Sequence, residues 1–169
     1  RTSPFAFTGN KFEFRMCPSS GSIAGPNFIL NTIVAEVLSE FADRLERAHD
    51  IESEVNDIII ETVKKHKRII FNGNGYSEDW IEEAAKRGLP NITTTVEAIK
   101  SLLDKKNIEV LEKHKVLTRE EVHSRYEIIL ENYSKTINIE ALTMLQMIKR
   151  EILPAVINFA GKLAKGINE

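Results

Sequence analysis

The sequence is poor in the features that mark secreted, membrane-spanning or nucleic-acid-binding proteins. Its single cysteine, Cys17, excludes an internal disulfide, and no apolar run reaches the length of about 18 residues that a membrane-spanning helix needs. Lysine and arginine (23) nearly balance aspartate and glutamate (25), so the formal net charge is −2. This balance gives no general attraction to nucleic acid or anionic lipid. We therefore expect a cytoplasmic protein that binds neither nucleic acid nor membranes.

Common metal and nucleotide motifs are also missing. The histidines follow no HExxH or Cys/His spacing, so we expect no zinc site. Residues 21–25 and 73–75 contain glycine but lack the Lys-Ser/Thr spacing and the strand-to-helix setting of a phosphate-binding loop. We interpret both stretches as connecting loops.

What is present is an ordinary soluble composition with helical periodicity. The 169 residues are 42% hydrophobic and 28% charged, which suits about one domain with a real core. Apolar residues recur at intervals of three and four along most of the chain, so we predict a mostly α fold, a helical bundle. The helices are expected over residues 27–48, 51–68 and 77–87, from residue 94 or 95 onward, and from residue 118 towards 165.

Local signals mark several helix ends. Asp50 is a candidate N-cap, Thr118 and Glu121 have the spacing of a capping box, and Gly88 stops the third helix. Pro154 is expected to kink or split the last helix. Because that helical pattern exceeds forty residues, we expect it to pack antiparallel against the first two helices or against another subunit.

The first fifteen residues look different from the rest. From Lys11 to Arg15 charged and apolar residues alternate, which predicts one short strand with Lys11, Glu13 and Arg15 on one face and Phe12 and Phe14 on the other. The chain also begins with arginine rather than methionine. We therefore expect this strand to belong to the sheet or barrel of a longer protein.

The three charged residues of this strand are the first candidate site. A carboxylate between two cations suits a metal ion bound to phosphate oxygens. The plainer interpretation is a solvated strand face whose charges pair with one another, and surface charge alternation is common enough to favour it from the pattern alone.

Longer stretches resemble one enzyme family. The run RTSPFAFTGNKFEFR at residues 1–15 resembles the end of the catalytic domain of type III glutamine synthetases. Residues 19–36 resemble the segment that follows in that family, and residues 141–155 resemble its C-terminal helix. The resemblance covers nearly the whole chain and favours a functional role for the charged strand.

The resemblance implies a role for four residues. Arg1 corresponds to an arginine that holds phosphate and the substrate carboxylate, and Lys11 to a basic residue on the ATP phosphates. Glu13 corresponds to a metal ligand, and Arg15 to the arginine that stabilises the transferring phosphoryl group and glutamate. The cofactors implied are ATP and Mg²⁺ or Mn²⁺. Ala6 departs from the type I pattern, which has a second arginine at that place.

The implied activity is ATP-dependent ligation of ammonia to L-glutamate through γ-glutamyl phosphate, by a homo-oligomer. Residues 1–25 are then the end of the catalytic domain and residues 26–169 a helical bundle, in which the helices after about residue 50 serve packing or assembly. Because most of the active site lies elsewhere, we expect the chain alone to be inactive. The alternative from another class is a stand-alone helical interaction module without catalysis.

Overall fold

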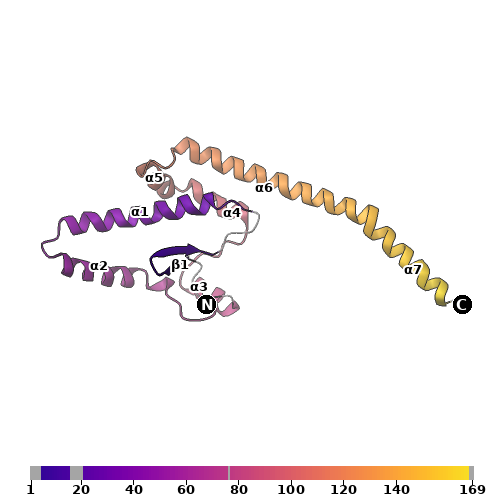
Figure 1. The fold of residues 1–169 in the computed structure, drawn as a ribbon, viewed down its shortest axis with the longest axis horizontal. Helices are drawn as coiled ribbons and strands as arrows, with labels where there is room; N and C mark the ends of the chain where they lie inside the picture. The colour runs from indigo at the N-terminus through magenta and orange to yellow at the C-terminus, as the bar shows by residue number, and fades with distance from the viewer. Residues whose placement is uncertain (1–4, 16–20, 76, 168–169) are drawn as a thin grey trace. The chain divides into compact units, whose positions relative to one another are not determined.

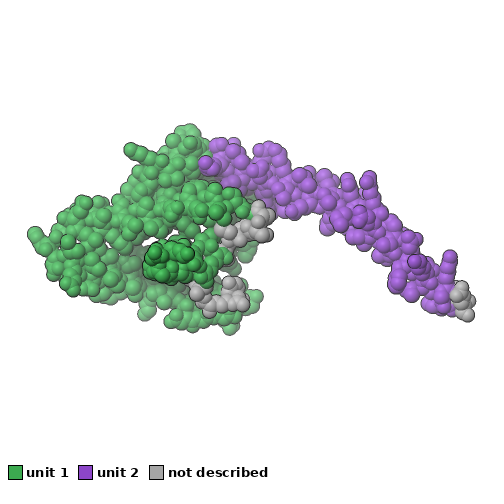
Figure 2. Space-filling view, in the orientation of Figure 1, with its two compact units in different colours: residues 1–122 green, residues 123–169 purple. Residues whose placement is uncertain are grey.

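The computed structural model describes residues 5–15, 21–75 and 77–167, and in these ranges the chain is mostly α-helical (Figure 1). This confirms the predicted fold class. The described residues separate into two compact units, residues 1–122 and residues 123–169, which Figure 2 shows in green and purple. Within the described ranges no helix combines the length and the apolar character that crossing a lipid bilayer requires.

Unit 1 begins with a two-stranded antiparallel hairpin. Strand β1 covers Phe5–Thr8 and strand β2 covers Lys11–Phe14, so the predicted strand has a partner that the sequence pattern did not reveal. The turn between them contains Gly9 with a φ of 70°, a conformation that glycine adopts without the steric cost of a side chain.

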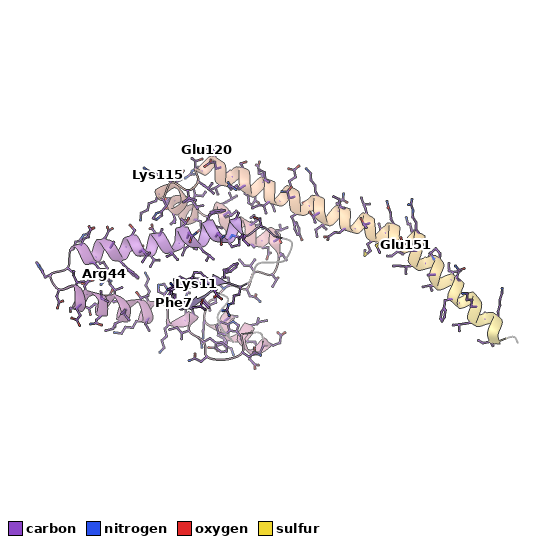
Figure 3. All side chains as sticks on the ribbon, viewed as in Figure 1. Phe7, Lys11, Arg44, Lys115, Glu120 and Glu151 are labelled. Carbon is purple, nitrogen blue, oxygen red and sulfur yellow. The ribbon has the colours of Figure 1, made fainter. Side chains whose placement is uncertain are left out.

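Two long helices follow. Helix α1 covers Ala24–Glu46 and helix α2 covers Ile51–Lys65. The predicted cap is confirmed, because the Asp50 side chain accepts hydrogen bonds from the backbone N–H groups of the first turn of α2. The helices contact each other, and Arg44 near the end of α1, labelled in Figure 3, pairs with Glu54 and Glu61 of α2 at 2.6 Å each.

The middle of unit 1 consists of short helices. The 3₁₀ helix η1 covers Lys67–Ile69 and helix α3 covers Glu78–Lys86. The predicted stop after α3 is confirmed: Gly88 has a φ of 69°, and Leu89 N–H bonds back to Ala84 C=O in a Schellman motif.

Helices α4 (Thr95–Lys100), η2 (Ser101–Leu103) and α5 (Lys105–Lys113) follow in unit 1. Ile108 and Leu111 of α5 are buried together with Val122, and Phe28 of α1 packs against them. Helix α5 is also tied to α1 by charge, because Glu36 accepts from Lys113 at 2.8 Å and pairs with His114 at 2.6 Å.

The last helical stretch begins in unit 1 and makes up unit 2. Helix α6 covers Arg119–Met147, the π-helix η3 covers Ile148–Ile152 and helix α7 covers Leu153–Ile167. The predicted capping box is confirmed, because Thr118 and Glu121 exchange side-chain-to-backbone hydrogen bonds. The irregularity expected at Pro154 appears directly before it: proline has no N–H to donate, and its ring crowds the carbonyl four residues earlier, at Arg150.

Candidate functional site

The candidate site lies on one face of the β-hairpin. Thr8 stands opposite Lys11, and Ala6 stands opposite Glu13. Because residues directly opposite each other in an antiparallel pair share a face, these four side chains lie on the same side of the hairpin. The other side is aromatic: the ring of Phe12 stacks on Phe5, with 4.8 Å between ring centroids. The hairpin thus separates a polar face from a phenylalanine face.

Glu13 is the centre of the polar face. Arg15 donates to one carboxylate oxygen, Oε2, from Nη2 at 2.6 Å and from Nε at 3.1 Å. The Thr8 hydroxyl donates to the other oxygen, Oε1, at 2.8 Å. The structure therefore brings Glu13 and Arg15 together, as the alternation predicted, and adds Thr8 as a third member.

These hydrogen bonds favour the charged form of the carboxyl group. The Arg15 guanidinium holds the pKa of Glu13 below its ordinary value, and the Thr8 hydroxyl lowers it further. Glu13 is therefore a carboxylate at neutral pH, the form that binds cations. The side chains of Arg15 and Glu13 keep 42% and 37% of their surface exposed, so the pair is open to water and contributes little to stability.

Lys11 provides the second cation of the face. Its side chain is exposed at the start of β2, where Figure 3 labels it, and within the described residues it forms no ion pair. An ammonium group without a carboxylate partner is available to an anionic ligand such as a phosphate group. Arg1, the fourth residue implied by the family resemblance, lies outside the described residues.

The Glu13 carboxylate can supply one ligand of a divalent metal site. A carboxylate has about four lone-pair sites, of which the hydrogen bonds from Arg15 and Thr8 occupy three, so one remains for a metal ion. Mg²⁺ takes about six oxygen ligands. Over the part of the chain that the structure describes, no group of three or more His, Cys, Asp or Glu could hold a metal. Glu13 can therefore serve as one ligand among several, not as a complete site.

Sequence reasoning missed Thr8. The signal was the Gly9-Asn10 pair, which is compatible with a two-residue hairpin turn and would have placed β1 beside β2. Once that register is known, Thr8 and Glu13 lie on the same face, within reach of each other.

Comparisons with known proteins agree on one family. Residues 54–169 match the model of the glutamine synthetase C-terminal domain. The chain is 41% identical to a glutamine synthetase of Butyrivibrio fibrisolvens over 170 residues, and 42% identical to the type-3 glutamine synthetase of Dictyostelium discoideum over 171 residues. It is 34% identical to a glutamine synthetase of Bacteroides fragilis over 171 residues.

All three alignments cover 99% of this chain, so they include the hairpin that precedes the family model's match. They cover 24%, 23% and 24% of the respective relatives. The chain thus spans about a quarter of the length of the curated relatives it matches.

Proposed function

The chain belongs to the glutamine synthetase family, whose C-terminal domain it contains, and we propose that it is part of a glutamate–ammonia ligase to which it contributes one edge of the active site. The observation that carries the proposal is the polar face of the hairpin. There an ionised carboxylate is held by Arg15 and Thr8, and an exposed ammonium group, that of Lys11, lies on the same face. The proposed reaction ligates ammonia to L-glutamate at the expense of ATP.

The proposed chemistry proceeds through γ-glutamyl phosphate. Transfer of the terminal phosphoryl group of ATP to the glutamate side chain spreads negative charge over the phosphoryl oxygens, and fixed cations stabilise that charge. Arg15 faces the transferring group and glutamate, Lys11 holds the ATP phosphates, and Arg1 holds phosphate and the substrate carboxylate. Bound Mg²⁺ or Mn²⁺, with Glu13 as one ligand, supplies further charge neutralisation.

The hydrogen bonds of Glu13 suit this role. They orient the carboxylate and keep it ionised, and the side chains of Arg15 and Glu13 both remain partly exposed to solvent, where a substrate can reach them. An ion pair that only solubilises a strand face needs no further hydrogen-bond donor. Here the Thr8 hydroxyl also binds the second carboxylate oxygen of Glu13 and holds it in place. This positioning favours the functional interpretation of the charged strand.

The proposal divides the chain by role. Residues 1–25 are the end of the catalytic domain, and residues 26–169 are a helical region that serves packing and assembly of a homo-oligomer in the cytoplasm. The ligands that complete a metal site, and the remaining contacts to ATP, glutamate and ammonia, lie outside this chain. The chain alone is therefore inactive.

The test is ligase activity of the full-length protein at saturating Mg²⁺. Arg15→Ala lowers kcat/KM at least about 100-fold, because it removes a cation whose stabilisation of charge is strongest in the transition state. Glu13→Gln lowers it by a similar factor, because a neutral amide would hold the charge-neutralising metal ion less well. Glu131→Gln is the matched control: it removes a carboxylate that pairs with Lys135 at 2.6 Å on α6, far along the chain from the hairpin, and leaves activity unchanged.

Two results would contradict parts of this proposal. Wild-type protein that is correctly assembled but has no ligase activity favours the helical interaction module without catalysis. If the wild type is active and the Glu13→Gln and Arg15→Ala variants keep full activity, the protein is a ligase but these two residues do not belong to its active site.

A further inference from the structure

Unit 2 carries an apolar stripe along α6 that one charged residue interrupts. Six of its residues follow one another at intervals of three, four or seven, the repeat that places side chains on one face of an α-helix. They are Tyr126, Ile129, Tyr133, Ile137, Met144 and Met147. Glu140 occupies the position on this face between Ile137 and Met144.

The stripe continues across the π-helix into α7. Met147 and Ile152 are five residues apart, a spacing that would place them on different faces of an ordinary α-helix. In the π-helix each turn contains about one extra residue, so the two side chains stay on the same face. From Ile152 the intervals of three and four resume, through Val156, Phe159, Leu163 and Ile167. The π-helix thus keeps the two halves of the stripe in phase.

No side chain of the stripe is buried in the part of the chain that the structure describes. Met144 is 56% exposed, Phe159 is 63% exposed, and the other members are exposed or half-buried. Helix α7 is apolar on most of its circumference, and such helices are normally covered by another element. Such exposure of a long apolar face favours a role as a contact surface.

A shallow, open groove of about 310 Å³ lies along the edge of the stripe near its middle, over the end of α6 and the π-helix. It is lined by the stripe residues Met144, Met147 and Ile152 and by the neighbouring Ile139, Glu140 and Thr143. Its lining is centred between Met144 and Met147, close to the midpoint of unit 2. A second copy laid antiparallel, with its two-fold axis at this midpoint, would place the same groove opposite this one, as an isologous interface requires.

The charges of the two halves also complement each other in that arrangement. Residues 123–144 carry three carboxylates and two cations, whereas residues 146–167 carry four cations and one carboxylate. Parallel pairing would set the basic halves against each other. Antiparallel pairing sets the basic half of each copy against the more acidic half of the other.

We propose that unit 2 pairs antiparallel with unit 2 of a second copy of this protein, along the apolar stripe and around an axis between Met144 and Met147. The inference deepens the homo-oligomer of the proposed function by naming its contact surface. About 45 residues of helix span about 67 Å, and a contact strip about 10 Å wide buries roughly 1,300 Å² over both copies. That area lies within the range of about 1,200–2,000 Å² of specific interfaces.

Cysteine cross-linking of the full-length protein tests the pairing. In a background without other reactive cysteines, Met144→Cys lies beside its symmetry mate, so a short bis-maleimide joins two copies. Tyr133→Cys and Phe159→Cys lie far from the axis and do not join to themselves. Co-expressed with different tags, these two variants cross-link to each other, because antiparallel pairing places residue 133 of one copy near residue 159 of the other.

Three results would overturn the proposal. Self-linking of both Tyr133→Cys and Phe159→Cys indicates a parallel pair. If the thiol of the Met144→Cys variant reacts freely with a mono-maleimide but joins no second copy, the stripe is uncovered. If that thiol is protected from the mono-maleimide and yet joins no second copy, something other than a second copy covers the stripe.

Association of full-length variants provides the second measurement. Met144→Glu places two carboxylates next to each other at the axis and weakens association at least tenfold in sedimentation. Ile128→Glu, an equal change in chemistry off the stripe, leaves association unchanged. Equal effects of both variants would contradict the assigned face. Neither readout uses ligase activity, so a failed pairing and a failed ligase assignment are told apart.

Discussion

The two units use their apolar residues in different ways. In unit 1 the helices turn back on one another, and Ile108, Leu111 and Val122 are buried in a shared core. In residues 123–167 no side chain is buried, although apolar residues recur with the same helical spacing. The difference lies in the helix ends: unit 1 has capped and sharply stopped helices, whereas unit 2 passes through its π-helix without a turn.

This contrast shows that helical periodicity identifies an apolar face but does not reveal what covers that face. Unit 1 closes its core through turns between helices that are close in sequence, as between α5 and α6. Unit 2 contains no turn that would bring a second helix alongside within its described residues. The same pattern therefore serves folding in one unit and, by our proposal, association in the other.

The largest expected effect is on the core of unit 1. Leu111→Ala should lower the free energy of unfolding by about 2–5 kcal/mol, because it opens a cavity beside Ile108 and Val122. Leu163→Ala, an identical change at an exposed site of α7, should change it by less than about 0.5 kcal/mol at concentrations where the chain does not associate. Urea unfolding measures both. Equal losses would erase the contrast between the units.

The helix stops of unit 1 give effects of about 1 kcal/mol in opposite directions. Gly88→Ala should destabilise by about 1–2 kcal/mol through its positive φ alone, since an added Cβ would meet no atom closer than Arg68 Nη1 at 3.9 Å. Lys115 ends α5 at a φ of 54° in the same kind of motif, so Lys115→Gly should stabilise by up to about 1 kcal/mol. Thermal unfolding of the two variants would refute this account if both shifted in the same direction.

The smallest expected effect concerns acid. Lys113 first and His114 second lower the pKa of Glu36 in the folded state, so its ionised form contributes stability above the ordinary glutamate value of about 4.3, and that contribution is lost as the pH falls through the lowered pKa. Glu36→Gln should therefore flatten the fall in stability below about pH 4.3.

A comparison with unit 2 sharpens this prediction. Lys135 also lowers the pKa of Glu131, but that pair lies within one helix, whereas Glu36 joins α1 to α5. Acid titration followed by circular dichroism should show loosening of unit 1 in wild type and in Glu131→Gln, and less of it in Glu36→Gln. Identical titrations of all three proteins would show that the interaction of Glu36 with α5 does not contribute to the acid sensitivity of unit 1.

Local chemistry made several features predictable from the sequence. The caps at Asp50 and at Thr118 with Glu121, and the stop at Gly88, depend on residues close together along the chain, so the pattern contains the whole interaction. The break near Pro154 follows equally locally from a missing N–H.

Other features depend on contacts that a pattern does not contain. Thr8 reaches Glu13 only because the hairpin register brings β1 beside β2, and Phe5–Thr8 alone has no clear alternation. Lys115 adopts its positive φ because the turn back to Leu111 requires it, although lysine shows no preference for that conformation. The five-residue spacing between Met147 and Ile152 can be interpreted as part of one apolar face only when the π-helix between them is known.

The most direct test of the central claim is the metal dependence of the full-length enzyme. If Glu13 is a metal ligand, Glu13→Gln should raise the Mg²⁺ concentration that gives half-maximal ligase activity at least tenfold, while Glu131→Gln leaves it unchanged. A Glu13→Gln enzyme with lower activity but an unaltered half-saturating Mg²⁺ concentration would contradict the assignment of Glu13 to the metal.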